Sequence, residues 1–199
     1  MARVSTVEFW EGLYARGGDG WELGGPAPPL VDFVTTTPPP RGRVAVPGAG
    51  RGHDARFLAA HGYDVTAIDF STAALTAARA LARRDRVNVT FEQRDIFTLP
   101  QSHAHAFDGV WEYTCYCAID PRRRRDYVDV LRAIVRPGGW LLGCFFPLRA
   151  QTAGPPFQVS MSEIRRVLAP AFRIERAFPP VRSVRPRQGR EWMVLARRT

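Results

Sequence analysis

The sequence predicts an α/β fold of the doubly wound type, in which helices cover both faces of a mostly parallel sheet. Apolar segments typical of strands alternate with amphipathic helical segments from Arg43 to about Phe146. The connections are short, as in parallel sheets built with crossover helices. The last two apolar segments have no helix between them, so they predict an antiparallel hairpin at the sheet edge.

Length and composition indicate a single globular domain over residues 1–199, which is 45% hydrophobic and 24% charged. The sequence begins without a basic region followed by an apolar stretch, and no apolar run approaches about eighteen residues. Three cysteines are too few, and odd in number, for a disulfide framework. We therefore expect a cytoplasmic protein that is not inserted in a membrane. The sequence indicates no oligomeric state.

The N-terminal part predicts two helices. Residues 5–16 place apolar and aromatic side chains near one helical face, and Ser5 or Thr6 can cap the first turn. A cluster of glycines ends this helix, and a loop rich in glycine and proline follows. A second helix over residues 30–36 stops before a run of three prolines.

The parallel strands start at RVAVPGAGRGHD, a strand that runs into a glycine-rich turn and then a helix over residues 54–61. YDVTAID is the second strand, after which Ser71 caps a helix that extends to about Arg83. The third, fourth and fifth strands are VNVTFEQRD, FDGVWEY and WLLGCFF. Before the fifth strand, a helix opens at Asp120-Pro121 and is closed by RPGG at residues 136–139.

The C-terminal part predicts a helix over residues 160–168 and then the strands FRIERAF and REWMVLARR. Because no helix separates these two strands, they must pair in antiparallel fashion. Seven strands with this ending form the layout of class I methyltransferases, which have a Rossmann-like fold.

The turn Gly48-Ala49-Gly50-Arg51-Gly52 follows the first predicted strand. Glycines at such a turn let the backbone approach a ligand, and the next helix offers N–H donors to anionic groups. NAD-dependent enzymes use a similar turn. Gly48 and Gly50 alone therefore leave open an adenosylmethionine site, an NAD site and a purely structural turn.

Acidic residues end the next two predicted strands. Asp69 can accept hydrogen bonds from both ribose hydroxyls of an adenosine, or it can support the helix cap at Ser71. Asp95 can accept the adenine amino hydrogens while Ile96 packs on the ring, or it can be a turn aspartate. Because NAD folds do not strictly require an acid there, Asp95 favours S-adenosylmethionine.

Glu112 and Tyr113 end the fourth predicted strand, where a doubly wound sheet opens its crevice. A carboxylate there suits the positive sulfonium or ammonium of S-adenosylmethionine, and a tyrosine ring can face a cation. The alternative is a structural pair at a strand end.

The net charge of +9 comes from arginine alone, because the sequence contains no lysine. Strong positive charge raises the question of a nucleic-acid partner. The arginines cluster at residues 83–86 and 122–125, without interleaved aromatic residues. We interpret both runs as solvated helix ends, and do not expect nucleic acid as a partner.

Several segments together resemble the thiopurine S-methyltransferase family, and they are most similar to its plant-type halide and thiol methyltransferase branch. These segments are FWEGLY, GWELGGPAPPLV, VPGAGRGHD, FDGVWEYTCYCAIDP, FFP, GPPFQVS and RPRQGREW. The resemblance extends from about Phe9 to Arg190. It implies S-adenosylmethionine as the cofactor and a small soft nucleophile, such as a thiol, thiopurine, halide or thiocyanate, as the methyl acceptor.

The resemblance also implies roles for individual residues. It makes residues 1–36 a lid over the cofactor, although the family commonly has tryptophan where Tyr14 stands. It places Phe146 near the substrate, where plant relatives have tyrosine, and Cys117 at a position where they also have cysteine. The residues it places on the cofactor are Trp10, Tyr14, Trp21, Gly48, Asp69, Asp95, Ile96 and Tyr113.

Methyl transfer from a sulfonium is an in-line displacement, so the protein mainly aligns the reacting groups and excludes water. Soft nucleophiles need little deprotonation, and we therefore assign no catalytic base and no metal. Arg187 or Arg190 is a candidate for capturing an anionic acceptor, with surface charge as the alternative.

Three other functions stay open at this point. A nucleic-acid methyltransferase would need a binding module or an Asn/Asp-Pro-Pro-Tyr/Phe motif, whereas EYTC stands at that place. A cofactor-binding protein without turnover would carry the same binding residues. An NAD-dependent oxidoreductase would need more chain for a substrate domain.

Overall fold

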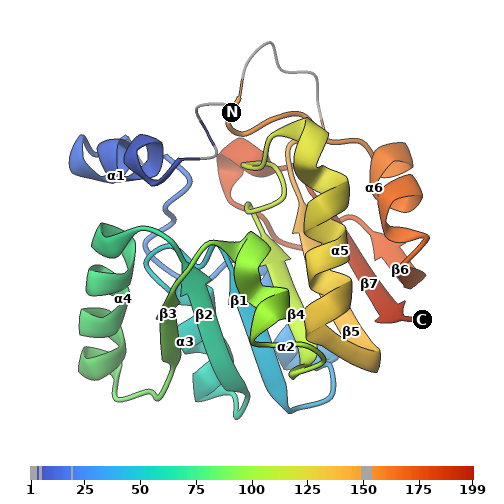
Figure 1. Ribbon diagram of the computed structural model, residues 1–199, viewed down its shortest axis with the longest axis horizontal. Coiled ribbons are helices and arrows are strands. Elements are labelled where there is room, and N and C mark those ends of the chain that lie inside the picture. Colours follow the sequence, from blue (N-terminus) through green and yellow to red (C-terminus); the bar gives the residue numbers. More distant parts are fainter. Residues whose placement is uncertain (1–3, 5, 19, 149–153) are drawn as a thin grey trace.

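The computed structural model describes residues 4, 6–18, 20–148 and 154–199, and a seven-stranded sheet forms its centre (Figure 1). The order across the sheet is β3-β2-β1-β4-β5-β7-β6, with the first five strands parallel and β7 antiparallel to both its neighbours. This confirms the predicted doubly wound sheet with an antiparallel C-terminal edge. The strands are β1 (Arg43–Pro47), β2 (Asp64–Asp69), β3 (Thr90–Gln93), β4 (Phe107–Tyr113), β5 (Val135–Phe145), β6 (Phe172–Phe178) and β7 (Trp192–Arg198).

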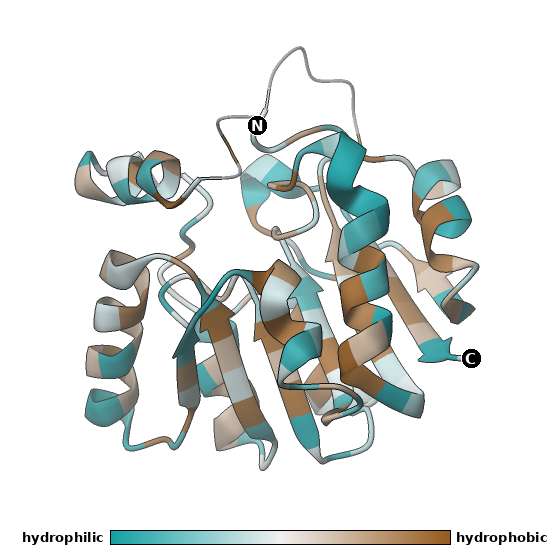
Figure 2. Cartoon of the chain, viewed as in Figure 1, coloured by the Kyte–Doolittle hydropathy of each residue, from teal (hydrophilic) through white to brown (hydrophobic). Residues whose placement is uncertain are grey.

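Helices cover both faces of the sheet, and apolar residues are concentrated on the strands and on parts of the covering helices (Figure 2). One core cluster joins α5 and α6 to the sheet, and a second joins α2 and α3 to its opposite face. The helices are α1 (Val7–Ala15), α2 (Pro28–Thr36), α3 (His53–Ala60), α4 (Thr72–Asp85), α5 (Arg124–Ile134) and α6 (Met161–Leu168), with short 3-10 turns η2 (Ile96–Gln101), η3 (Pro121–Arg123) and η4 (Arg185–Arg187).

The helix starts follow the capping residues of the sequence. Ser71 precedes α4 and its hydroxyl accepts the backbone N–H of Ala74 at 3.1 Å. Thr6 caps α1 by accepting the N–H of Phe9 at 3.4 Å, whereas Ser5, the other predicted cap, lies outside the described residues. Within the part of the chain that the structure describes, no helix has the length and apolar character needed to cross a membrane.

The segment RPGG, which the sequence predicts to close a helix, follows the end of α5 but is itself part of a strand. Helix α5 ends at Ile134, and β5 begins at once with Val135, which pairs with Phe107 of β4. A Cβ on Gly139 would lie 2.5 Å from the Val135 side chain and 2.7 Å from the Asp108 carbonyl oxygen. Glycine therefore serves here to let two strands approach closely.

The arrangement of the central strands fixes where a ligand can bind. Strand β1 lies between β2 and β4, so the chain leaves β1 toward one side of the sheet and later returns on the other (Figure 1). In open α/β sheets, the crevice outside the carboxyl ends of the strands at this switch point is the usual binding place.

Candidate functional site

A cavity of about 500 Å³ lies at this switch point, and α1 supplies one of its walls. The other walls come from the turn after β1, the ends of β2 and β4, and the segments around η2, Phe146 and η4. Gly50, Glu112 and Tyr113 are predicted site residues that do not line it. The predicted residues that do line it are Trp10, Tyr14, Trp21, Gly48, Asp69, Asp95, Ile96, Phe146, Arg187 and Arg190.

The glycine turn after β1 is built by left-handed backbone. Gly48 has φ +62°, and a Cβ there would lie 2.9 Å from the Cys115 side chain, so only glycine fits between the cavity and the end of β4. Gly50 has φ +53° and donates its N–H to Oδ2 of Asp69 at 2.8 Å. The Gly50 amide therefore orients the acid at the end of β2 and does not face the cavity.

Two carboxylates form what we call the acidic side of the cavity, Asp69 at the end of β2 and Asp95 after β3. Asp69 accepts the N–H groups of Gly50 and, at 2.9 Å, Ser71, and burial raises its pKa. Asp95 begins η2 by accepting the N–H of Phe97 at 2.9 Å. Both acids have the structural contacts that the sequence left as alternatives, and both also line the cavity.

Glu112 corrects the prediction of a carboxylate that faces the sulfonium. It is 1% exposed and accepts hydrogen bonds from the Tyr116 N–H at 2.7 Å and the Tyr127 hydroxyl at 2.5 Å. Successive strand residues point to opposite faces, and this one points into the core beside α5. Burial raises the Glu112 pKa to about 7, and the group holds the loop after β4 in place.

Tyr113 also lies behind the cavity wall. Its hydroxyl accepts a hydrogen bond from Arg187 and donates one to Oε1 of Glu191 at 2.6 Å. The Arg187 guanidinium lies 5.1 Å from the centre of the Tyr113 ring. The predicted face for a cation is thus used by a protein arginine, because Tyr113 points toward the segment before β7.

Phe146, Arg187 and Arg190 form the arginine side of the cavity, at the ends of β5 and of the segment before β7. Each guanidinium lies 5.1 Å from the Phe146 ring centre. Arg187 is 5% exposed, and its hydrogen bonds within the described residues go to the neutral Tyr113 hydroxyl and to the Trp21 carbonyl oxygen at 3.0 Å. A buried cation without a directly bonded carboxylate favours an anion in the cavity.

Aromatic rings close the cavity from the N-terminal side. The Trp21 ring packs edge-on against Trp10 and Tyr14, with ring centres 5.4 and 5.5 Å apart. Glu11, which follows Trp10 in α1, accepts the backbone N–H of Thr72 at the start of α4. Helix α1 has no fully buried residue of its own, so these contacts hold it over the cavity.

The loop before α2 is fastened by residues that sequence reasoning missed. Asp54 accepts the Ala27 N–H and the Trp111 indole N–H, each at 2.7 Å, and burial raises its pKa. The ring nitrogen Nε2 of His53 lies 2.7 Å from Glu22. The sequence does not show that the segments RGHD and WELGG lie side by side. The contact between His53 and Glu22 could therefore not be predicted from it.

The acidic groups that line the cavity are the carboxyls of Asp69, Asp95 and Asp120, and none of its described lining residues is a histidine. Cys117 lines it, but burial raises the pKa of its thiol to about 12, and its Sγ donates to the Thr114 carbonyl oxygen at 3.2 Å. Groups of His, Cys, Asp or Glu that could hold a metal ion are absent from the described ranges. The site can therefore position and desolvate a nucleophile, but it has no histidine or thiolate with which to deprotonate one.

Comparison with known proteins gives concordant matches. The family model described as Thiopurine S-methyltransferase matches residues 5–194. The chain is 32% identical to "Probable thiol methyltransferase 2" of Arabidopsis thaliana, over 92% of this chain and 81% of that protein. It is 31% identical to "Thiocyanate methyltransferase 1" of Brassica oleracea, over 94% and 84%.

Solved structures agree on the fold. A protein from a study of disulfide-to-thioacetal conversion in echinomycin biosynthesis superposes with a TM-score of 0.81 at 24% identity, covering 96% of this chain and 92% of its own. The 1,6-didemethyltoxoflavin-N1-methyltransferase of Burkholderia thailandensis superposes with a TM-score of 0.74 at 23% identity, covering 97% and 87%.

Proposed function

This chain belongs to the thiopurine S-methyltransferase family, and from that membership we propose that its cavity aligns S-adenosylmethionine with a thiol or a similarly soft small nucleophile. The protein is an S-adenosylmethionine-dependent methyltransferase that acts on small nucleophiles. The single observation that carries the proposed use of the cavity is its two-sided lining, with the buried Asp69 at the end of β2 and Asp95 after β3 on one side and arginines beside Phe146 on the other.

The residues present fit an adenosyl group on the acidic side. Asp69 is held rigidly by two backbone N–H groups, which leaves oxygen lone pairs for ribose hydroxyls. Asp95 and Ile96 supply an acceptor and an apolar surface for an adenine ring. Because Gly48 has no side chain, its backbone fits between these groups and the Cys115 side chain. We assign the adenosine to these residues.

The aromatic residues Trp10, Tyr14 and Trp21 form the proposed lid, within residues 1–36. When bound, S-adenosylmethionine supplies a methyl group on a positively charged sulfur. Faces of tryptophan and tyrosine attract such a cation, and burial under them excludes water. Exclusion of water strengthens the electrostatic interactions of every charged group in the cavity.

The arginine side is the proposed place of the acceptor. Arg187 and Arg190 can hold an anion against Phe146 without donating a proton to it, because an arginine keeps its charge. Alignment of this kind supplies roughly 7–11 kcal/mol of a barrier. A thiol is a few per cent thiolate at pH 7, so the acceptor can enter already ionised.

We further propose that nucleic acid is not the acceptor and that residues 1–199 form one domain. The run at residues 122–125 supports the first of these proposals, because Arg122 pairs with Asp120 and Arg124 with Glu163, each at 2.7 Å. The charges of two of the four arginines are therefore compensated within the protein, although Arg122 stays exposed. A cytoplasmic location fits the three buried cysteines, none of which is in a disulfide.

One assay tests the proposed acceptor class. The purified protein is incubated with methyl-labelled S-adenosylmethionine and, separately, with bisulfide, iodide, thiocyanate, a thiopurine and bulk RNA. We expect label to be transferred to at least one of the small nucleophiles and none to RNA. Transfer to RNA, or to none of the small nucleophiles, would refute the assignment.

A further inference from the structure

The arginine run at the start of α5 is not one uniform charged surface. Arg122 and Arg125 are exposed, and the Arg123 guanidinium covers the Phe97 ring, 3.6 Å from its centre. Arg124 is different, because it is only 3% exposed. A buried arginine needs partners for its five N–H groups, and those partners identify what it does.

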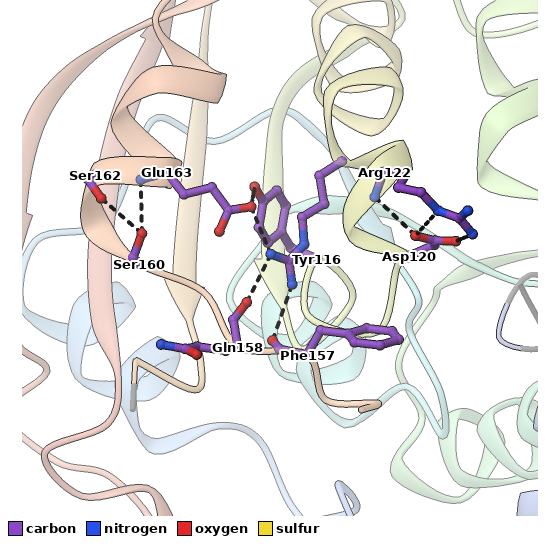
Figure 3. Close-up of polar contacts among 9 residues, drawn as sticks. Tyr116, Asp120, Arg122, Phe157, Gln158, Ser160, Ser162 and Glu163 are labelled. Atoms are coloured by element: carbon purple, nitrogen blue, oxygen red, sulfur yellow. Dashed lines mark hydrogen bonds and ion pairs between the residues drawn. The ribbon is translucent and has the colours of Figure 1, made fainter. Parts of the chain in front are cut away.

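Arg124 reaches across from α5 to the segment before α6. Its Nη1 donates to Oε1 of Glu163 at 2.7 Å and to the carbonyl oxygen of Gln158 at 3.0 Å. Its Nη2 donates to the carbonyl oxygen of Phe157 at 3.2 Å. Figure 3 shows these acceptors converging from α6 and from the extended chain that leads to it. One side chain thereby fixes two consecutive peptide groups.

Glu163 is itself held firmly as the acidic partner. It belongs to the first turn of α6, where its N–H donates to the Ser160 hydroxyl at 3.1 Å. The Tyr116 hydroxyl donates to the same Oε1 at 3.0 Å, and the Arg124 guanidinium lies 4.7 Å from the Tyr116 ring centre. The Arg124 clamp, by which we mean Arg124 with Glu163 and Tyr116, thus joins α5, α6 and the loop after β4.

The clamped segment is continuous with a wall of the cavity. Pro155 and Pro156 line the cavity immediately before the two clamped carbonyl groups. The Phe157 N–H donates to the Cys117 carbonyl oxygen at 2.7 Å, and Cys117 lines the cavity as well. Arg124 does not line the cavity. Its influence on a bound molecule therefore passes through Pro155 and Pro156.

We propose that Arg124 is a positioning residue that sets the shape of the acceptor space by holding the Pro155–Pro156 wall. This inference rests on the proposed function of the cavity. The wall limits how a large thiol lies, whereas a small anion such as bisulfide fills too little of the cavity to depend on it. Lysine cannot replace Arg124, because one ammonium does not match a carboxylate and two carbonyl groups in a planar fork.

The first test measures the wall directly and needs no acceptor. Hydrogen exchange of the Phe157 amide is compared in the wild type, Arg124→Met and Arg124→Lys, with exposed Arg125→Met as the matched control. We expect exchange to accelerate at least tenfold in Arg124→Met, partly in Arg124→Lys and not in the control. Unchanged exchange in folded Arg124→Met would overturn the clamp.

The second test separates positioning from general damage. We expect Arg124→Met to lower kcat/KM for thiophenol at least tenfold relative to that for bisulfide, with the dissociation constant of S-adenosylhomocysteine within twofold of wild type. An equal loss for both acceptors, or a parallel loss of S-adenosylhomocysteine binding, would contradict the positioning role. A wild type that methylates neither probe would count against the proposed function, while the exchange measurement still tests the clamp.

Discussion

The Glu11 carboxylate accepts the backbone N–H of Thr72 at 2.5 Å, and it thereby joins α1 to the first turn of α4. A carboxylate at a helix N-terminus is stabilised both by the hydrogen bond and by the helix dipole. Thr72 lies three residues after Asp69. The helix over the cavity is therefore attached beside the acid that we assign to the ribose.

Replacing Glu11 should loosen the lid without unfolding the protein. Such a contact is worth about 1 kcal/mol, or roughly a fivefold change in affinity. We expect Glu11→Ala, which removes the acceptor, to weaken S-adenosylhomocysteine binding several-fold and to leave Tm nearly unchanged, because α1 buries no residue fully. Glu8→Ala, an exposed change on the same helix, is the control. Equal affinities for both variants would show that the contact between Glu11 and Thr72 does not hold the lid.

Glu112 should make stability depend on pH. Its pKa is raised from 4.5 to about 7 in the folded protein, so folding favours the protonated form. The associated stability is complete below about pH 4.5 and is lost as the pH rises through about 7, by about 3 kcal/mol. Glu112→Gln keeps an acceptor for Tyr116 and cannot ionise.

Urea unfolding of the wild type and Glu112→Gln at several pH values tests this sign. We expect the variant to gain stability relative to wild type as the pH increases from 5 to 8. A difference that does not vary with pH would mean that the Glu112 carboxyl is not held protonated by its burial.

The rate should follow the ionisation of the acceptor and not that of a protein base. The cavity has no histidine among its described lining residues, and burial keeps the Cys117 thiol protonated. We therefore expect kcat/KM to rise with pH up to the pKa of the free thiol. The midpoint of this rise in kcat/KM should therefore lie at a lower pH for thiophenol than for the less acidic 2-mercaptoethanol. A shared midpoint would reveal a protein group that accepts the proton.

Arg187 and Arg190 should differ in effect, although both face Phe146. Losing a hydrogen bond or contact to a charged group costs about 1.5 kcal/mol or more, which is roughly tenfold in KM for an anion. We expect Arg190→Ala to raise only the acceptor KM. Arg187→Ala should also weaken the binding of S-adenosylhomocysteine, because it removes the hydrogen bond to the Trp21 carbonyl oxygen. Arg185→Ala, at an exposed position, is the control. An unchanged acceptor KM in both Arg187→Ala and Arg190→Ala would mean that neither arginine captures the anion.

The sequence predicts the parts of the site that follow from strand order. Asp69, Asp95 and Gly48 come near one another because the carboxyl ends of neighbouring parallel strands meet at one edge. Side-chain direction at a strand end cannot be read from the sequence in the same way, so the sequence-based expectation for Glu112 is wrong: its side chain is buried in the core. The place of Phe146 came from the family resemblance.

Long-range partners are the other part that sequence reasoning missed. Arg124 looks like one of four equivalent arginines until its guanidinium is seen on Glu163, thirty-nine positions away. Asp54 likewise gives no sign in the sequence that it will bind the Ala27 N–H. Such pairs depend on how helices pack on the sheet, which no local pattern encodes.

We expect the crevice between β1 and β4 to bind the adenosyl cofactor through Asp69. The most direct measurement is calorimetry with S-adenosylhomocysteine on the wild type, Asp69→Asn and the exposed control Asp64→Asn. We expect saturable one-to-one binding that weakens at least tenfold in Asp69→Asn and is retained in the control. Absence of binding to the folded wild type would contradict cofactor binding in this crevice, and equal affinity in Asp69→Asn would contradict the role of Asp69.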